Sequence, residues 1–298
     1  MTHAAIAHPF EVSFEFFPPN TPEMEETLWR SIKRLEPLAP RFVSVTYGAN
    51  GSTRERTHRT VRRILTETTL VPAAHLTCVG AGKDDVLAVA DEYWDAGVRH
   101  IVALRGDPPV GTAYAPHPEG FPFATELVQG LRARHDFEIS VSAYPEGHPE
   151  APSLHVDLDN LKRKVDAGAT RAITQFFFDN DVYFRFVERA QRAGITVPIV
   201  PGIMPVTNFV QMRKFAVRAG ASIPSHMGWL FEGLENDADT RRLVAATVAA
   251  EQCQALAKQG VYEFHFYTLN RADLSYAICH ILGLRSEVGG RGSGESGR

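Results

Sequence analysis

The stretch Val12-Ser13-Phe14-Glu15-Phe16-Phe17-Pro18-Pro19 predicts a short β-strand that ends at two prolines. Aromatic and β-branched residues favour a strand, and proline cannot donate a hydrogen bond to a sheet. One carboxylic acid, Glu15, stands among three phenylalanines. Because an apolar setting disfavours the charged form, we expect the pKa of Glu15 to be raised toward the range of a general acid. The alternative is a surface edge strand on which Glu15 simply points to water.

Strand-like segments of this kind recur along the chain, with helical periodicity between them. The eight predicted strands are 12–17, 41–47, 72–78, 100–106, 139–145, 171–178, 197–203 and 263–269. Several of the helical patterns end in a glycine that suits a left-handed C-cap, namely Gly97, Gly168, Gly194 and Gly220. A further helix at 273–282 closes the series. This repeated alternation predicts an α/β fold of the (β/α)8 TIM barrel type rather than an open doubly wound sheet.

One departure from the alternation lies before the eighth strand, where two helical stretches, 225–231 and 237–258, replace a simple loop. The proline-rich segment 108–122 is expected to be a long loop between a strand and a helix, because the same pattern continues on both sides. We therefore expect a single TIM-barrel catalytic domain over residues 1–285. The Gly- and Ser-rich tail 286–298 is expected to be disordered.

Composition is that of an ordinary globular protein of 298 residues, 44% hydrophobic and 22% charged, with a net charge of −4. No run of Lys or Arg suggests binding to nucleic acid or to an anionic membrane. The sequence has no apolar span of membrane-crossing length and no signal-peptide pattern at its start, so we expect a cytoplasmic protein. Its three cysteines, Cys78, Cys253 and Cys279, lie far apart and are expected to be reduced thiols.

Polar side chains recur at alternate positions near the ends of six predicted strands. They are Ser13 and Glu15, Ser44 and Thr46, His75 and Thr77, Arg105 and Asp107, Ser140, Ser142 and Tyr144, and Gln175. Barrel interiors are normally filled by Val, Ile and Leu, and active sites lie at the carboxyl ends of the strands. We therefore expect a ligand with many hydrogen-bonding edges at this mouth.

Several chemistries are disfavoured by what the strands lack. No predicted strand contains a lysine, which argues against a Schiff-base enzyme, and no metal centre is expected because no His-x-His pair occurs. His75 is interpreted as a hydrogen-bonding or core residue, and His265 as structural. No glycine-rich nucleotide motif is present. Glu15 and Asp107 could form the carboxylate pair of a glycosidase, but aromatic sugar platforms are missing from the loops.

Eight stretches together carry a specific resemblance. They are 13–19, 43–49, 75–78, 103–107, 143–145, 160–164, 173–178 and 265–271, with Ala103-Leu104-Arg105-Gly106-Asp107 and Ile173-Thr174-Gln175-Phe176-Phe177-Phe178 among them. In this order they resemble the methylenetetrahydrofolate reductase family, specifically its single-barrel bacterial form. The resemblance extends from Ser13 to about Gly283.

The resemblance implies a function. Enzymes of this family use non-covalently bound FAD to pass a hydride, in a ping-pong reaction, from NADH or NADPH to 5,10-methylenetetrahydrofolate, which becomes 5-methyltetrahydrofolate. It implies that Glu15 is the general acid and that Asp107 lies beside the flavin and the pterin. Gln175 is implied as a folate contact, Phe215 and Arg271 as contacts of the folate tail, and the protein as a homo-oligomer. The choice between NADH and NADPH stays open.

The family pattern also implies a set of FAD-binding residues. These are Thr46, Tyr47, Ala49, His75, Arg105, Gly106, Asp107, Tyr144, His148, Ala151, Asp157, Asn160, Arg163 and Lys164. A helix pattern begins after Asp157, so we expect Arg163 and Lys164 near the start of a helix, where they could neutralise a diphosphate. Their alternative interpretation is a solvated helical face. The loop 108–121 is longer than in the family form. The alternative function is a folate- or pterin-binding barrel without redox chemistry.

Overall fold

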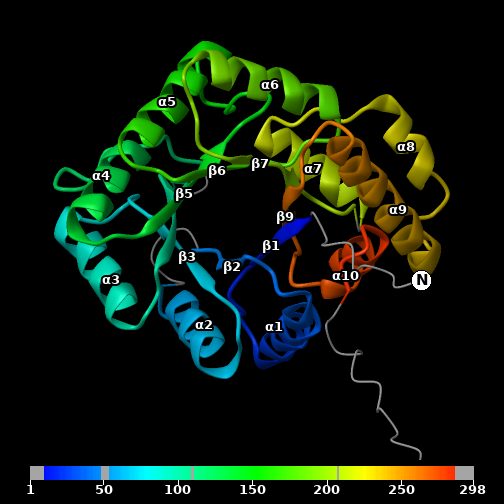
Figure 1. Ribbon diagram of the computed structural model, residues 1–298, viewed down its shortest axis with the longest axis horizontal. Helices are drawn as coiled ribbons and strands as arrows, with labels where there is room; N and C mark the ends of the chain where they lie inside the picture. Colours follow the sequence, from blue (N-terminus) through cyan, green and yellow to red (C-terminus); the bar gives the residue numbers. More distant parts are fainter. Residues whose placement is uncertain (1–9, 48–53, 109–110, 207, 286–298) are drawn as a thin grey trace, which may run out of the picture.

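The computed structural model describes residues 10–47, 54–108, 111–206 and 208–285, which form a barrel of parallel strands inside a ring of helices (Figure 1). The strands are β1 (Glu11–Phe16), β2 (Phe42–Val45), β3 (Pro72–Thr77), β4 (His100–Leu104), β5 (Glu138–Ala143), β6 (Arg171–Thr174), β7 (Ile199–Val200), β8 (Gly202–Ile203) and β9 (Glu263–Tyr267). Their order is β7-β6-β5-β4-β3-β2-β1-β9-β8, and every pairing is parallel. The predicted (β/α)8 barrel is confirmed.

The seventh predicted strand, 197–203, is divided at Pro201. The first half, β7, pairs with β6, and the second half, β8, pairs with β9. Proline has no N–H to donate to either neighbour, so the ladder is interrupted there, although the Pro201 carbonyl accepts from the N–H of His265 at 3.0 Å. Two short strands thus share one position of the barrel and close it.

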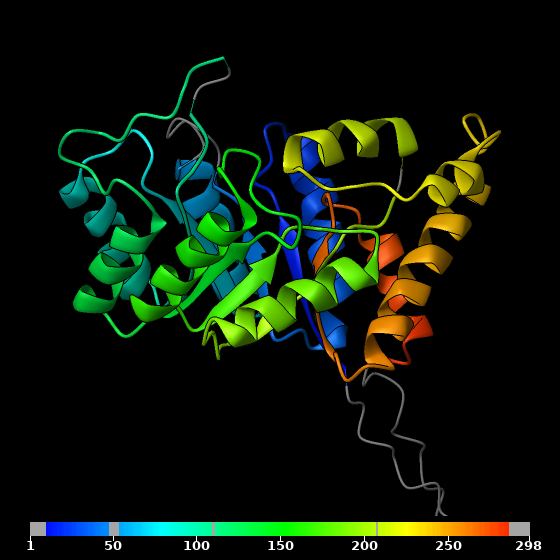
Figure 2. The same cartoon turned by 90° about the horizontal axis from the view of Figure 1, so that it is seen from above.

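The helices follow the predicted alternation. They are α1 (Pro22–Leu35), α2 (Arg54–Glu67), α3 (Lys83–Asp95), α4 (Ala124–Arg134), α5 (Leu154–Asp166), α6 (Asn180–Arg192), α7 (Phe209–Ala219), α8 (Ser225–Phe231), α9 (Ala238–Ala257) and α10 (Ala272–Ile281), with a short 3-10 turn η1 (Glu36–Leu38). The predicted C-cap glycines all have positive φ angles, from 69° at Gly220 to 113° at Gly168. The two extra helices before the last strand are α8 and α9, and α9 lies outside α10 (Figure 2).

Helix α1 shows how the local sequence produces these elements. The Thr21 hydroxyl accepts from the N–H of Met24 at 3.3 Å and caps the helix, and Pro22 occupies the first position, where its missing N–H costs nothing. On one face Leu28, Ile32 and Leu35 are buried against the barrel. This apolar stripe, rather than intrinsic helix propensity, holds the helix in place.

Apolar residues form a large core between the barrel and its helices, and a much smaller cluster inside the barrel. The inner cluster consists of Phe42, Ala73, Val102 and Ile173, with Leu104 packed against it. The remaining interior contains buried polar pairs, such as Ser13 with His265 and Ser140 with His100, each at 2.8 Å. These pairs agree with the predicted inward positions of Ser13 on β1 and Ser140 on β5.

On β4 the predicted inward residues are wrong. His100 and Val102 point into the barrel, as their contacts with Ser140 and with the inner apolar cluster show. The strand ends at Leu104, so Arg105 and Asp107 belong to the loop that follows it. Their side chains reach the mouth because the chain turns at that point, not because of strand parity.

The amino-terminal ends of the strands carry a network of paired charges. The buried Arg171 forms ion pairs with Glu138 and Glu263, the second at 3.2 Å. Arg41 pairs with Glu11 at 2.6 Å and lies 4.0 Å from Glu263. This network closes the end of the barrel opposite to the mouth.

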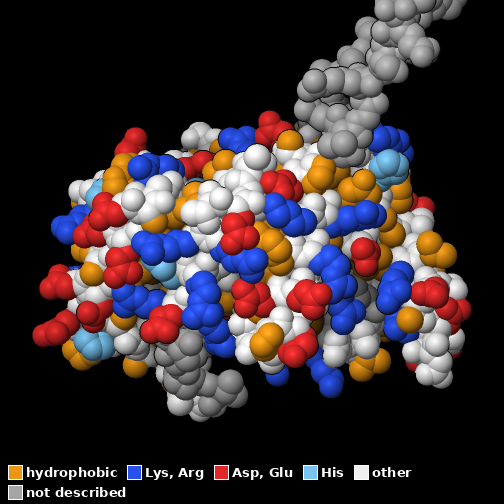
Figure 3. Space-filling view, turned by 90° about the horizontal axis from the view of Figure 1, so that it is seen from below, with side chains coloured by type: hydrophobic (Ala, Val, Ile, Leu, Met, Phe, Trp, Pro, Cys, Tyr) orange, Lys and Arg blue, Asp and Glu red, His pale blue; other side chains and the backbone are white. Residues whose placement is uncertain are grey.

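On the face shown in Figure 3, side chains of both charge signs are interspersed. Within the described ranges, no helix combines the length and the apolar character needed to cross a membrane. The predicted tail, 286–298, lies outside the described residues.

Candidate active site

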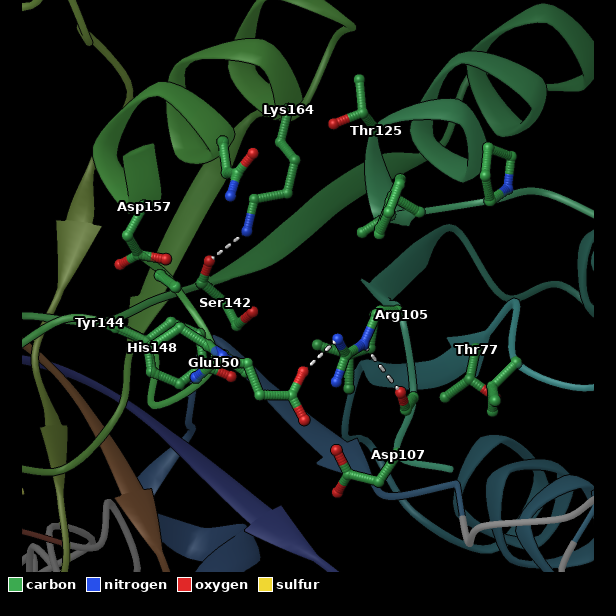
Figure 4. A pocket seen from close by; sticks show the side chains of 18 of the residues that line it. Thr77, Arg105, Asp107, Thr125, Ser142, Tyr144, His148, Glu150, Asp157 and Lys164 are labelled. Atoms are coloured by element: carbon green, nitrogen blue, oxygen red, sulfur yellow. Dashed lines mark hydrogen bonds and ion pairs between the residues drawn. The ribbon is translucent and has the colours of Figure 1, made fainter. Parts of the chain in front are cut away.

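A cavity of about 630 Å³ opens beside the carboxyl ends of β2 to β5. Most of the residues that the sequence assigned to FAD binding line it together: Tyr47, Arg105, Gly106, Asp107, Tyr144, His148, Ala151, Asp157, Asn160, Arg163 and Lys164. They come from several separate elements, and six of them are labelled around one space in Figure 4: Arg105, Asp107, Tyr144, His148, Asp157 and Lys164. The size is typical of a cofactor site.

The turn after β4 delivers Arg105 and Asp107 to this cavity. Gly106 has a φ angle of 84°, and a Cβ atom there would lie 2.5 Å from Val79 and 2.9 Å from Thr77. Only glycine therefore fits this position. The Arg105 guanidinium donates to the Glu150 carboxylate at 2.6 Å (Figure 4).

Helix α5 lines another side of the cavity. Ser153 caps it by accepting from the N–H of Val156 at 3.3 Å, so the helix begins before Asp157 and not after it. Arg163 and Lys164 consequently lie in its last turn, and their predicted place at the start of a helix is wrong. The carbonyl end of a helix favours such cations.

Lys164 is the most deeply placed cation of the site. Its Nζ donates to the carbonyl oxygen of Ser142 at 2.6 Å, and the side chain points into the cavity (Figure 4). Burial lowers the pKa of Lys164 to about 8, although the negative charge of Asp157 opposes the shift. Burial likewise raises the pKa of Asp157, against the influence of Lys164. An anion placed beside this ammonium group would offset its poor solvation.

Glu15 lies at the same mouth, deeper in the barrel. Its carboxylate is 3.5 Å from Nε2 of His75 and 3.8 Å from Nε2 of His265, with 22% of the side chain exposed. Burial raises the pKa of Glu15, but the interactions with His265 and His75 outweigh it, so this pKa lies below its ordinary value. The predicted rise is therefore wrong. Local sequence showed the phenylalanines but not the two imidazoles.

The two histidines next to Glu15 have different surroundings. Burial lowers the pKa of His75 to about 4, so His75 is neutral near pH 7. His265 exchanges a 2.8 Å hydrogen bond with Ser13 through Nδ1 while its Nε2 faces Glu15. The buried hydrogen bond with Ser13 is compatible with the interpretation of His265 as structural, and His265 in addition lies next to the candidate acid.

Several predicted residues do not line the cavity. Thr46 follows β2, and its carbonyl accepts from the Thr57 hydroxyl at 2.8 Å. Gln175 follows β6 and is partly buried, and Phe215 is an exposed residue of α7. Arg271 precedes α10 and lines a separate cavity of about 880 Å³ between α1, α9 and α10.

The sequence also missed part of the site. Residues 122–126, at the start of α4, and Glu150 line the cavity. A helix that follows a barrel strand directs its N-terminus toward the mouth, and this rule could have identified the first group. Nothing local marks Glu150. Ala49, also predicted to contact FAD, lies outside the described residues.

Comparison with known proteins now decides the family. The family model described as methylenetetrahydrofolate reductase matches residues 1–283. The chain belongs to this family. The resemblance found in the sequence is thereby confirmed.

Relatives within the methylenetetrahydrofolate reductase family match nearly the whole chain. The 5,10-methylenetetrahydrofolate reductase of Salmonella typhimurium is 56% identical over 95% of this chain and 94% of its own length. That of Escherichia coli is 55% identical over the same shares. A maize methylenetetrahydrofolate reductase (NADH) is 34% identical over 92% of this chain but only 48% of its own length.

Among solved structures, a protein from Clostridium thermocellum described as binding two copies of 5-methyl-5,6,7,8-tetrahydrofolic acid has a TM-score of 0.59 and 16% identity. The match covers 92% of this chain and 94% of that one. At this identity the likeness concerns the fold alone.

Proposed function

We propose that this chain catalyses the reduction of 5,10-methylenetetrahydrofolate to 5-methyltetrahydrofolate by NADH or NADPH, with non-covalently bound FAD. The observation that carries the proposal is the convergence, in one cavity, of most residues that the family pattern assigns to FAD. They lie far apart in the sequence, and a barrel brings them together at the end where its active sites lie. The membership in the family supports the same reaction.

The residues present fit an anionic flavin nucleotide. Arg105, Arg163 and Lys164 supply three cations to the cavity, and the N-terminus of α4 lines it as well, at the end of a helix that favours anions. Lys164, with its poorly solvated ammonium group, suits a phosphate particularly well. FAD, when bound, supplies the redox chemistry, accepting a hydride from the nicotinamide and donating it to the folate.

Glu15 is proposed to hold the proton that opens the five-membered ring of the substrate. In the structure its pKa lies below the ordinary value, so the carboxyl group must gain a proton as the substrate binds. Covering the exposed part of the side chain removes water and favours the neutral form. His75 and His265 both lie within 4 Å of this carboxyl group.

Asp107 and Gln175 are proposed to orient the folate. Asp107 lies on the cavity rim and can accept hydrogen bonds from the amino groups of a pterin. Gln175 has a neutral amide that can both donate and accept, and its Oε1 already accepts from the N–H of Phe176 at 3.0 Å. We further propose that nicotinamide and folate use this mouth in turn, as a ping-pong reaction requires. Phe215 and Arg271 are proposed contacts of the folate tail.

The test is a visible absorption spectrum of the purified protein during anaerobic addition of NADH or NADPH and then of 5,10-methylenetetrahydrofolate. We expect a flavin band that bleaches with one nicotinamide and returns with the folate. This result would also identify the preferred donor. A protein that stays colourless after incubation with FAD, yet binds folate, would instead support a folate-binding barrel without redox chemistry.

The homo-oligomer implied by the resemblance is a separate prediction. Sedimentation equilibrium of the purified chain tests it, and a mass of one chain at micromolar concentration would contradict it.

A further inference from the structure

The loop between β4 and α4 contains an aromatic residue, Tyr114, which contacts three residues of the cavity wall and also the buried thiol of Cys78. Its ring lies 4.4 Å from the guanidinium carbon of Arg105. Its hydroxyl donates to the carbonyl of Pro122 at 2.5 Å, and its ring is 5.8 Å from that of Phe123. Arg105, Pro122 and Phe123 line the cavity, whereas Tyr114 stands behind them.

The loop that carries Tyr114 is itself anchored on its far side. The N–H of Lys83 donates to the carbonyl of Glu119 at 2.9 Å. At Gly120, a Cβ atom would lie 2.5 Å from the carbonyl oxygen of Ala81, so the backbones approach closely there. The carboxyl side of the segment that carries Tyr114 is therefore anchored, by the contact with the start of α3.

Arg105 is held from two directions at once. The Tyr114 ring covers one face of the guanidinium, and the Glu150 carboxylate accepts from its edge at 2.6 Å. Only 20% of the Arg105 side chain is exposed, compared with 55% of Glu150. A stacked guanidinium keeps the plane of its donors fixed, which is the geometry needed for a bidentate bond to a phosphate.

We propose that Tyr114 is the positioning residue of Arg105, and that its ring sets how tightly the chain retains FAD. The inference rests on the proposed function, since it concerns the flavin nucleotide assigned to this cavity. Tyr114 acts on FAD binding through Arg105 alone. It does not contact the reacting atoms.

The test compares FAD dissociation constants, measured from the quenching of flavin fluorescence, for the unaltered chain, Tyr114→Leu and Tyr114→Phe. We expect Tyr114→Leu to weaken FAD binding about 3- to 10-fold, the range of a partly buried cation–π contact. Tyr114→Phe keeps the ring and should stay close to the unaltered chain. Tyr262→Leu is the matched control, because this exposed tyrosine lies just before β9, at the opposite end of the barrel.

A double substitution separates positioning from general stability. In an Arg105→Gln background, Tyr114→Leu should cause no further loss of FAD affinity, because the group that it positions is gone. A full additional loss there, or a Tyr114→Leu variant that binds FAD like the unaltered chain, would overturn the inference and leave the proposed function intact. Failure of the unaltered chain to bind FAD would overturn both.

Discussion

Charged side chains have different kinds of partners at the two ends of the barrel. At the amino-terminal end, Arg171 is almost completely buried and has two carboxylate partners, Glu138 and Glu263. At the mouth, the cation Lys164 donates to a neutral carbonyl, that of Ser142, and burial lowers its pKa in spite of the negative charge of Asp157. The acid Glu15 likewise has two imidazoles for neighbours instead of a permanent cation.

This difference teaches where ligands belong. A buried charge with charged partners is already balanced by the protein, and removing one partner lowers the free energy of unfolding. A buried charge with only neutral or titratable partners keeps capacity for a ligand of opposite charge or for a proton. We therefore expect substitutions at the first end to change folding and substitutions at the mouth to change binding and catalysis.

The largest expected effect is that of Glu15→Gln on catalysis. Glutamine keeps the shape but cannot donate an acidic proton, so the rate of folate reduction should fall by a factor of about 10² to 10⁴. Flavin binding and flavin reduction by the nicotinamide should persist, because they do not need this proton. Stopped-flow measurement of the two half-reactions separates these effects.

Glu263→Gln is the matched control at the opposite end. It removes one carboxylate of Arg171 but leaves Glu138 in place. We expect Glu263→Gln to reduce folate near the unaltered rate and to lose about 1 to 3 kcal/mol of unfolding free energy.

The outcome that contradicts the prediction for Glu15 is full folate turnover in Glu15→Gln. It would show that Glu15 is not the general acid.

Next in size is the effect of Arg171→Met on stability. The change leaves Glu138 and Glu263 without their shared cation, and breaking a buried ion pair in this way costs about 3 to 5 kcal/mol. Urea unfolding followed by circular dichroism measures the loss. Arg192→Met, which removes an exposed pair with Glu188, should change the unfolding free energy by less than about 0.5 kcal/mol. Equal stabilities of the two variants would contradict the comparison.

A smaller effect is expected for Lys164→Met. FAD affinity should fall by about 10- to 100-fold, since a charge-assisted hydrogen bond to phosphate is lost. The unfolding free energy of the flavin-free chain should stay the same or rise, because a poorly solvated charge is removed. Lys162→Met, on the same helix but paired with Asp166, is the control and should leave FAD affinity unchanged. Isothermal titration with FAD decides between them.

The sequence could predict the barrel because its signal is local and repeated. Period-two polar positions, glycine caps and the extra helices α8 and α9 all follow from neighbouring residues. The interruption at Pro201 could not be placed in the same way. It depends on which strand lies on each side of the residue, and that is decided only when the barrel closes.

The sequence could predict which residues line the candidate site, but not the pKa of Glu15 or the place of Lys164 on its helix. The family motifs identified most of the residues that line the cavity. The predicted rise in the pKa of Glu15 is wrong, however, because His265, which lowers it, lies 250 residues further along the chain. The predicted position of Lys164 at the start of a helix is wrong because Ser153, and not Asp157, caps α5. Both errors concern contacts or caps that hydrophobic periodicity does not encode.

The smallest predicted effect is a pH dependence that comes from Lys164. Its pKa in the folded chain is about 8, below the ordinary value of 10.5, so between these values the unfolded chain binds more protons than the folded one. Unfolding free energy therefore gains a contribution from Lys164 that increases as the pH rises through this window.

The measurement is the difference in unfolding free energy between the unaltered chain and Lys164→Met at several pH values, since other titrating groups cancel in that difference. A pKa unit corresponds to about 1.4 kcal/mol, and because partial exposure screens the group we expect a change on the order of 1 kcal/mol across the window. Saturating FAD should suppress this change, because a bound phosphate favours the charged ammonium group and returns its pKa toward the ordinary value. If the two curves of unfolding free energy against pH ran parallel without FAD, the pKa of Lys164 would be the same in the folded and unfolded chain. Lys164 would then not differ from the paired charges at the amino-terminal end of the barrel.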